Sequence, residues 1–334
     1  MVFVDDLLAN YIYHLKLGDM QEYNDMSVFP LYSKGDDSLY ITLKEALDTD
    51  LLTVTEIDGS GSVPELKVVN MANVPVLLLD GEELVGAKQN RVLNTTILLK
   101  ENSETVIPVS CTEQGRWSYN SLEFKESGNV AAYRVRRTKA TSVNTSLKMN
   151  GEFRSDQRAV WNRIDDMSRD AGVNSRTRAM SDVYESRIED LEKYHHLFPV
   201  FEDQKGILVM FKGEVMGMDI LSSSIAYFVL HWKLLKSYAM EAILTDEDND
   251  DVEAGDAKFN GLDNAKLFLD NVRLSMDEKH KSVGYGCDHR LEGPGVVGSS
   301  LTCKDQVIHA AFFSTEDQKK EDMSSYQKRR SFRM

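Results

Sequence analysis

Short apolar runs separated by polar turns fill the first third of the chain, and this spacing constrains the fold more than any other feature. Residues 52–57 alternate between apolar and polar side chains, residues 66–69 follow a glycine-rich turn, and residues 74–79 form a nearly continuous apolar run. Similar runs come at 95–99 and 105–109. Short runs with turn residues between them are typical of strands that pair with their sequence neighbours. The first half is therefore predicted to be β-rich and mostly antiparallel.

Helical spacing takes over after Gly151. Ser155 can cap a helix that Gly172 ends, and a second helix is predicted over 177–195 because apolar residues recur at helical intervals. Lys212 and Gly213 form the turn of a predicted hairpin. A long helix is predicted from Ser222, then a short helix, and then strands at 272–276, 282–285, 296–302 and 307–313. The predicted class is α+β, with helices and a further antiparallel set of strands in the C-terminal half.

Composition excludes several classes of protein. The 334 residues carry a net charge of −15, which repels nucleic acid and anionic membrane surfaces. The most apolar segment, 221–244, contains several charged residues, so we interpret it as a buried amphipathic helix, and no membrane association is expected. Three cysteines without a C-x-x-C pair and no secretory leader favour a reducing cytosol, so a cytoplasmic location is predicted.

A dense polar cluster lies at 80–94, between two apolar runs. Its carboxylates are candidates for acid–base catalysis, its cations for binding an anion, and its amides for hydrogen bonds to a ligand. The candidate residues are Glu82, Glu83, Lys88, Gln89, Arg91 and Asn94. Residues 88–148 hold ten Lys and Arg against five Asp and Glu, a local charge of +5, so the rest of the chain carries −20. This basic context favours an anionic ligand.

A second polar cluster at 109–117 adds Cys111, Glu113, Gln114 and Arg116. Cys111 is a candidate nucleophile and Glu113 a candidate acid or base, although a structural cysteine is the competing interpretation. Glu82, Glu83 and Glu113 would also suit a divalent cation, so the cofactor stays unknown. Alternatively, the ions of both clusters pair with one another and stabilise a β-rich core.

Three other sequence patterns resemble functional motifs, but their sequence context does not support a functional interpretation. Gly293, Gly295 and Gly298 spell G-x-G-x-x-G, but a strand pattern follows where a nucleotide-binding fold needs a helix, so we predict a glycine-rich turn. Cys287 and His289 have spacing that zinc ligands could use on a strand, but a small buried cysteine and a surface histidine are the preferred interpretation, and no metal site is predicted. The basic strip at 134–139 is expected to be an extended, solvated segment, and the alternative is an anion-binding edge beside the pocket.

Both polar clusters belong to a longer resemblance. The stretches L-L-L-D-G-E-E-L-V-G-A-K-Q-N-R-V-L-N and I-P-V-S-C-T-E-Q-G-R-W, with V-F-P-L-Y near Val28 and V-G-Y-G-C-D-H-R-L near Val283, resemble an uncharacterised family. It is the ADP-ribosylglycohydrolase- and rhodanese/phosphatase-superfamily-associated protein domain family. The resemblance implies one integrated α+β domain over 27–313, with lobes at 27–150 and 151–313, after an N-terminal helix in 1–26 and before a flexible tail at 314–334. The family name implies a link to ADP-ribose, NAD-derived metabolites or phosphate chemistry.

We therefore expect a polar pocket that binds a small anionic metabolite, nucleotide or ADP-ribose-like, and that hydrolyses it or transfers part of it. The sequence alone is compatible with an enzyme and with a protein that only binds. The alternative is a non-enzymatic module whose polar clusters form a buried salt-bridge network and whose function lies in contact with a protein partner or a second copy of the chain.

Overall fold

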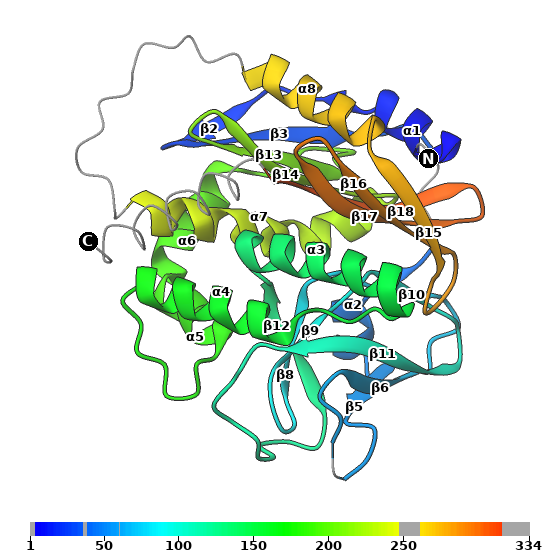
Figure 1. The fold of residues 1–334 in the computed structure, drawn as a ribbon, viewed down its shortest axis with the longest axis vertical. Coiled ribbons are helices and arrows are strands. Elements are labelled where there is room, and N and C mark those ends of the chain that lie inside the picture. The colour runs from blue at the N-terminus through cyan, green and yellow to red at the C-terminus, as the bar shows by residue number, and fades with distance from the viewer. Residues whose placement is uncertain (1–3, 36–38, 60, 247–260, 316–334) are drawn as a thin grey trace.

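The computed structural model describes residues 4–35, 39–59, 61–246 and 261–315. In this part of the chain the strands form three sheets, and helices pack between and around them (Figure 1). The predicted α+β class, with strands dominating the first half and helices followed by further strands in the second, is confirmed. The flexible tail was expected over 314–334, but Ser314 ends strand β18, and residues 316–334 lie outside the described residues.

The largest sheet combines strands from both ends of the sequence. Its order is β1-β3-β13-β14-β18-β17-β16-β15, with β2 pairing β3, and every pairing is antiparallel. Strand β3, from the first half, pairs with β13, so the two halves share one sheet. The strands are β1 Lys16–Leu17, β2 Gln21–Tyr23, β3 Met26–Tyr32, β13 Gly206–Phe211, β14 Glu214–Leu221, β15 Met276–Lys281, β16 Cys287–Gly293, β17 Val296–Cys303 and β18 Gln306–Ser314.

Helices cover both faces of this sheet (Figure 1). On one face α1 (Asp6–Tyr13) and α8 (Gly261–Arg273) pack through residues such as Leu8 and Phe268. The N-terminal helix is shorter than the expected 1–26, because β1 and β2 follow it. Helix α8 continues to Arg273, so the strands expected at 272–276 and 282–285 lie later, at β15 and β16. The predicted turn of the glycine motif is Pro294 and Gly295, between β16 and β17, whereas Gly293 and Gly298 lie within these two strands.

The other face packs on α3 (Tyr133–Asn150) and α7 (Ser224–Asp246), which share a large apolar core with it. The basic strip at 134–139 is therefore helical, which corrects the expected extended segment. Its residues are also mostly buried, because Arg136 pairs with Asp219 at 2.5 Å and Lys139 pairs with Asp80. Among the described residues, no helix combines the length and apolar character needed to cross a bilayer.

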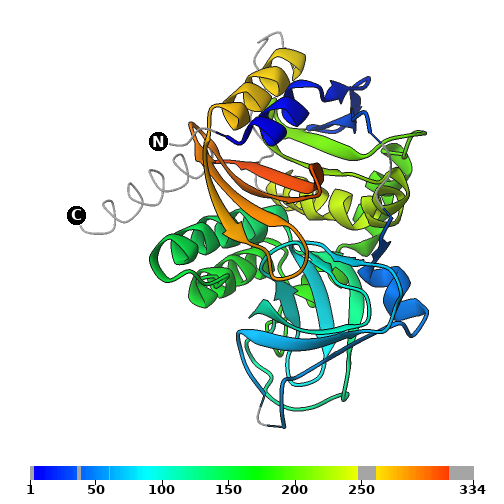
Figure 2. The ribbon, with the colours of Figure 1, turned by 90° about the vertical axis from the view of Figure 1, so that its right-hand side faces the viewer.

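The lower half of the molecule is a strongly curved six-stranded sheet in the order β12-β8-β9-β11-β6-β5 (Figures 1 and 2). A bridge between Thr55 and Glu123 brings its two edges together. A smaller sheet, β10-β7-β4, packs beside it. The elements are β4 Ile41–Thr42, α2 Leu43–Asp48, β5 Leu52–Thr55, β6 Glu65–Asn70, β7 Val76–Leu78, β8 Glu82–Gly86, β9 Arg91–Leu93, β10 Ile97–Leu99, β11 Ser103–Cys111 and β12 Phe124–Val130.

Three further helices border this lower half. Asp156 caps the first through the backbone N–H groups of Arg158 and Ala159, and its apolar face packs Val160 and Ile164 into the core. The second brings polar side chains next to β12. These helices are α4 Gln157–Asp170, α5 Met180–Ser186 and α6 Ile188–Leu197.

Candidate functional site

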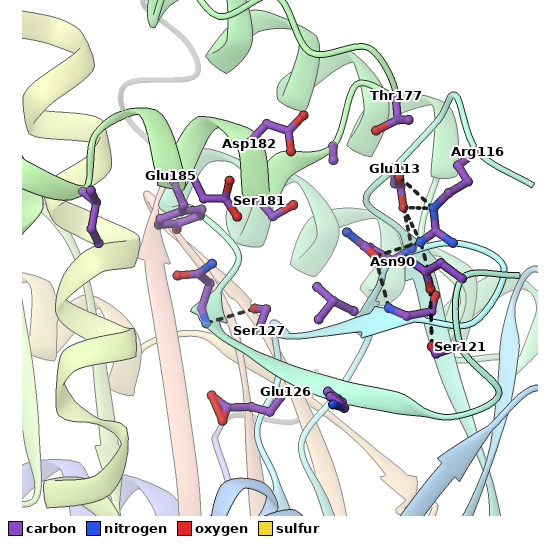
Figure 3. Close-up of a pocket in the computed structure, with 18 of the residues that line it drawn as sticks. Asn90, Glu113, Arg116, Ser121, Glu126, Ser127, Thr177, Ser181, Asp182 and Glu185 are labelled. Carbon is purple, nitrogen blue, oxygen red and sulfur yellow. Dashed lines mark hydrogen bonds and ion pairs between the residues drawn. The ribbon is translucent and has the colours of Figure 1, made fainter. Parts of the chain in front are cut away.

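A cavity of about 720 Å³ lies where α5, β8, β12 and the 113–121 segment meet (Figure 3). Glycine makes this junction possible at Gly115, because a Cβ there would lie 2.9 Å from the Thr177 Cα. The Gly115 N–H donates to the Thr177 carbonyl at 2.7 Å, and Met180 N–H donates to Thr112 at 2.9 Å. The two contacts hold the start of α5 against the end of β11, so α5 forms one wall of the cavity.

Arg116 and Glu113 form a second wall. The Arg116 guanidinium donates to both Glu113 oxygens, at 2.9 Å from Nε and 2.7 Å from Nη2. Its other N–H groups donate to the Ala87 carbonyl at 2.7 Å and to Asn90 at 3.1 Å, as Figure 3 partly shows. Most of the donors of Arg116 are occupied within the protein. This residue therefore shapes the wall and offers little free charge to a ligand.

The adjacent residues Glu82 and Glu83 have different environments. Glu82 is fully buried and accepts a 2.7 Å hydrogen bond from Lys233, whose Nζ also lies 2.9 Å from Glu126. Glu83 is equally buried, but Thr112 donates to it at 2.8 Å and its Oε2 has no partner among the described residues. Glu82 is therefore enclosed as one member of an ion-pair group. Among the described residues, no cation lies within ion-pair distance of Glu83, although its charge acts on the pKa of Lys236 from farther away.

Burial dominates the titration of Glu83. It raises the pKa of this carboxyl to about 7, because the charged form loses its hydration, and the Thr112 hydroxyl only partly compensates. The negative charge of Glu113 raises the pKa further. A carboxyl that titrates near neutral pH can both donate and accept a proton under physiological conditions.

Four of the predicted residues gather away from the cavity, at one end of the curved sheet. Arg91 is buried, its Nη1 donates to Gln89 at 3.1 Å, and its Nη2 lies 3.8 Å from Glu56. Lys88 donates to the Gly59 carbonyl at 2.9 Å. Cys111 is buried beside Arg91, and burial raises the pKa of its thiol to about 11, against the opposing effect of Arg91. Arg91, Gln89, Lys88 and Cys111 contact other protein groups in the interior, as structural residues do. None of the four lines the cavity.

Asn94 and Gln114 lie apart from both groups. Asn94 donates to the Phe153 carbonyl at 3.0 Å and accepts from Ser110 at 2.6 Å, so it connects β9 and β11 to the segment before α4. Gln114 is exposed and accepts from Arg178 at 3.0 Å. Of the residues predicted from sequence, the structure therefore places Glu113 and Arg116 on the cavity and Glu83 close behind it.

One family profile, described as the ARG and Rhodanese-Phosphatase-superfamily-associated Protein domain (ARPP-1), matches residues 14–313. The chain belongs to this family. The match confirms the resemblance carried by the two polar clusters, and it extends over both halves of the ARPP-1 fold. No curated protein and no solved structure matches the chain.

The cavity also has lining residues that sequence reasoning missed. Asp182 and Glu185 reach it from α5, and Lys125 reaches it from β12. Lys236 reaches it from the middle of α7 and donates to the Gly128 carbonyl at 2.6 Å. In the sequence, Lys236 is one of the several charged residues in the apolar segment 221–244. Its place in the site could not have been found without the packing of α7 against β12.

The described residues contain no group of His, Cys, Asp or Glu side chains arranged to hold a metal ion. His289, expected at the surface, is buried and hydrogen-bonded to Asp277 at 2.8 Å and to Thr302 at 2.9 Å. Its two ring nitrogens are therefore both engaged within the protein.

Proposed function

We propose that the cavity binds a small anionic metabolite of the nucleotide or ADP-ribose-like class, and that the protein hydrolyses it or transfers part of it. The observation that carries this proposal is the distribution of unpaired charge around the cavity. Asp182 and Glu185, on α5, have no partner among the described residues, and neither has Lys125 on β12. In Figure 3, Asp182 and Glu185 lie across the cavity from the β12 residues Glu126 and Ser127.

A phosphorylated sugar suits such a two-sided lining. Carboxylates accept hydrogen bonds from sugar hydroxyls, and ammonium groups attract phosphate oxygens. Among the other charged residues of the cavity, Glu113 pairs with Arg116, Glu126 pairs with Lys233, and Lys236 donates to Gly128 and Asn129. The unpaired groups are therefore the ones that remain for a ligand, and their chemistry matches a molecule that carries both hydroxyls and phosphate.

Glu83 would supply the acid–base chemistry. It lies behind the cavity wall, next to Thr112, and its pKa of about 7 allows either proton donation or acceptance at neutral pH. The family description, which associates the domain with ARG and rhodanese–phosphatase superfamily proteins, supports a metabolite of this class. The three cysteines are all free, which suits the reducing cytosol that we expect for the chain.

Isothermal titration calorimetry tests the binding proposal with ADP-ribose, NAD, ADP and ribose 5-phosphate. We expect heat with at least one of them and an affinity roughly tenfold weaker for Asp182→Asn, because a hydrogen bond to a charged group contributes about 1.5 kcal/mol or more. Glu189→Gln, an exposed change on α6 outside the cavity, is the matched control. Absence of heat with all four compounds, or equal weakening in the control, would contradict the proposal.

A second candidate function is a protein-interaction module. One observation that favours it is the enclosed ion pair of Glu82 with Lys233, which stabilises the fold. Another is a set of exposed apolar side chains near the cavity, because Trp117, Tyr119 and Leu122 are 47%, 45% and 82% exposed. Sedimentation of the chain with an ADP-ribosylglycohydrolase tests this candidate. A complex that Leu122→Ser weakens would support it, and independent sedimentation at micromolar concentrations would count against it.

A further inference from the structure

Lys236 is the most unusual charged residue of the cavity. It projects from α7 toward the irregular part of β12, where the register between β8 and β12 shifts. Its Nζ donates to the Gly128 carbonyl at 2.6 Å and to the Asn129 side-chain oxygen at 2.5 Å. The residue is only 6% exposed, and it lines the cavity. Lys236 is therefore almost buried, and its side chain belongs to the cavity wall.

No carboxylate among the described residues pairs with this amine. Lys233, one turn earlier on α7, shows the contrast, because it lies 2.7 Å from Glu82 and 2.9 Å from Glu126. Burial, and then the positive charge of Lys233, lower the pKa of Lys236 to about 8, against the opposing negative charges of Glu126 and Glu83. A substantial fraction of Lys236 is therefore neutral near physiological pH, which is rare for a lysine.

The hydrogen bonds of Lys236 suit the neutral amine. An ammonium carries three N–H groups, and the described residues provide two hydrogen-bond acceptors, so one position of the tetrahedral nitrogen has no acceptor. In the neutral form both remaining N–H groups still donate to Gly128 and Asn129, and the lone pair occupies the open position. An amine with a free lone pair at the wall of a cavity is a nucleophile.

We propose that the Lys236 amine forms an imine with an aldehyde or ketone group of the metabolite bound in the cavity. This inference rests on the proposed function, because the same cavity positions the substrate. The Nζ lone pair attacks the carbonyl carbon, the carbonyl π electrons move to oxygen, and one N–H proton passes to that oxygen through solvent, giving a carbinolamine. Protonation of its hydroxyl by solvent then releases water and forms the C=N bond.

The surroundings of Lys236 also suit the product. A protonated imine keeps the positive charge on nitrogen, and the rings of Trp232 and Tyr184 have their centroids 5.3 Å and 5.7 Å from Nζ. Such cation–ring contacts stabilise the charged iminium as well as the ammonium. The cavity volume of about 720 Å³ admits a ligand of metabolite size.

Reductive trapping tests the proposal. The folded protein is incubated at pH 8 with pyridoxal 5′-phosphate, an anionic aldehyde, and reduced with sodium borohydride, and the labelled lysine is identified by peptide mass spectrometry. We expect about one label per chain at Lys236, formed at least roughly tenfold faster than at exposed lysines, because an ordinary lysine with a pKa near 10.4 is well under a hundredth neutral at this pH. Lys236→Arg should lose this label, whereas Lys148→Arg, at an exposed ion pair with Glu292, should keep it.

The outcomes separate this inference from the proposed function. Labels spread over exposed lysines, with Lys236 unmodified in protein that melts cooperatively, would overturn the imine proposal. If calorimetry detects metabolite binding and no label forms, the imine proposal fails and the proposed function stands. Equal labelling of Lys236 by pyridoxal, which lacks phosphate, would support the nucleophilic amine and count against an anion site. Preference for the phosphorylated aldehyde would support both.

Discussion

Removing the charge of Glu83 should change how the stability of the protein depends on pH. The carboxyl has a pKa of about 7 in the folded chain against 4.5 for the free group, so between these values the folded state holds a proton that the unfolded state has released. Wild-type stability should therefore fall as the pH rises through this window. Glu83→Gln cannot titrate, and its amide oxygen can still accept from Thr112. From pH 5 to pH 8 the variant should gain about 2–3 kcal/mol relative to wild type.

Urea denaturation at pH 5, 6, 7 and 8 measures this difference, with unfolding followed by tryptophan fluorescence. Glu65→Gln, at an exposed carboxyl on β6, is the matched control and should remain parallel to wild type. A constant difference between Glu83→Gln and wild type across the pH range would refute the reasoning. It would mean that Glu83 is hydrated or paired with a cation in solution.

Three other perturbations follow from the structure. Glu82→Ala removes the partner of a buried ammonium and should cost about 3–5 kcal/mol in urea denaturation, whereas Asp48→Ala, at an exposed helical ion pair, should cost under about 1 kcal/mol. Gly86→Ala would place a Cβ 2.7 Å from the Ser121 side chain. It should lower the free energy of unfolding by about 1–3 kcal/mol more than Gly128→Ala, because a Cβ at Gly128 meets nothing within 4 Å and both glycines have a positive φ. Equal urea midpoints for the two variants would contradict this expectation. Cys111 is buried and its thiol has a raised pKa, so a thiol reagent should modify two cysteines in the native protein and three in the denatured protein. Modification of all three cysteines in the native protein would show that Cys111 is accessible.

The two polar clusters identified from sequence proved to be parts of several arrangements. Glu113 and Arg116 line the cavity, and Glu83 lies behind it, whereas Arg91, Gln89 and Lys88 gather at the end of the curved sheet. Neighbouring residues on a strand point to opposite faces, so Glu82 and Glu83 were certain to meet different surroundings. Which face would be the cavity depended on α5 and α7, which come from elsewhere in the sequence.

The sequence by itself determined the class of the fold and the local elements with strong patterns. Alternating and continuous apolar runs predicted the antiparallel strands of the first half, and the glycine-rich turn between β16 and β17 followed from its flanking strand patterns. Helix α3 was not predicted because basic residues occupy several of its buried positions, so its apolar residues show no clear helical periodicity. The acidic partners of these basic residues, such as Asp219, are distant in sequence.

Only the tertiary structure decided which polar residues share a site. Lys236 acquires its lowered pKa from burial against β12 and from Lys233, and Glu83 acquires its raised pKa from the loss of solvent. Both effects depend on distances between elements that the chain brings together only when folded. Local residue pattern predicts strands and helices because backbone geometry is local. The electrostatics of a site depend on long-range packing, which the pattern does not encode directly.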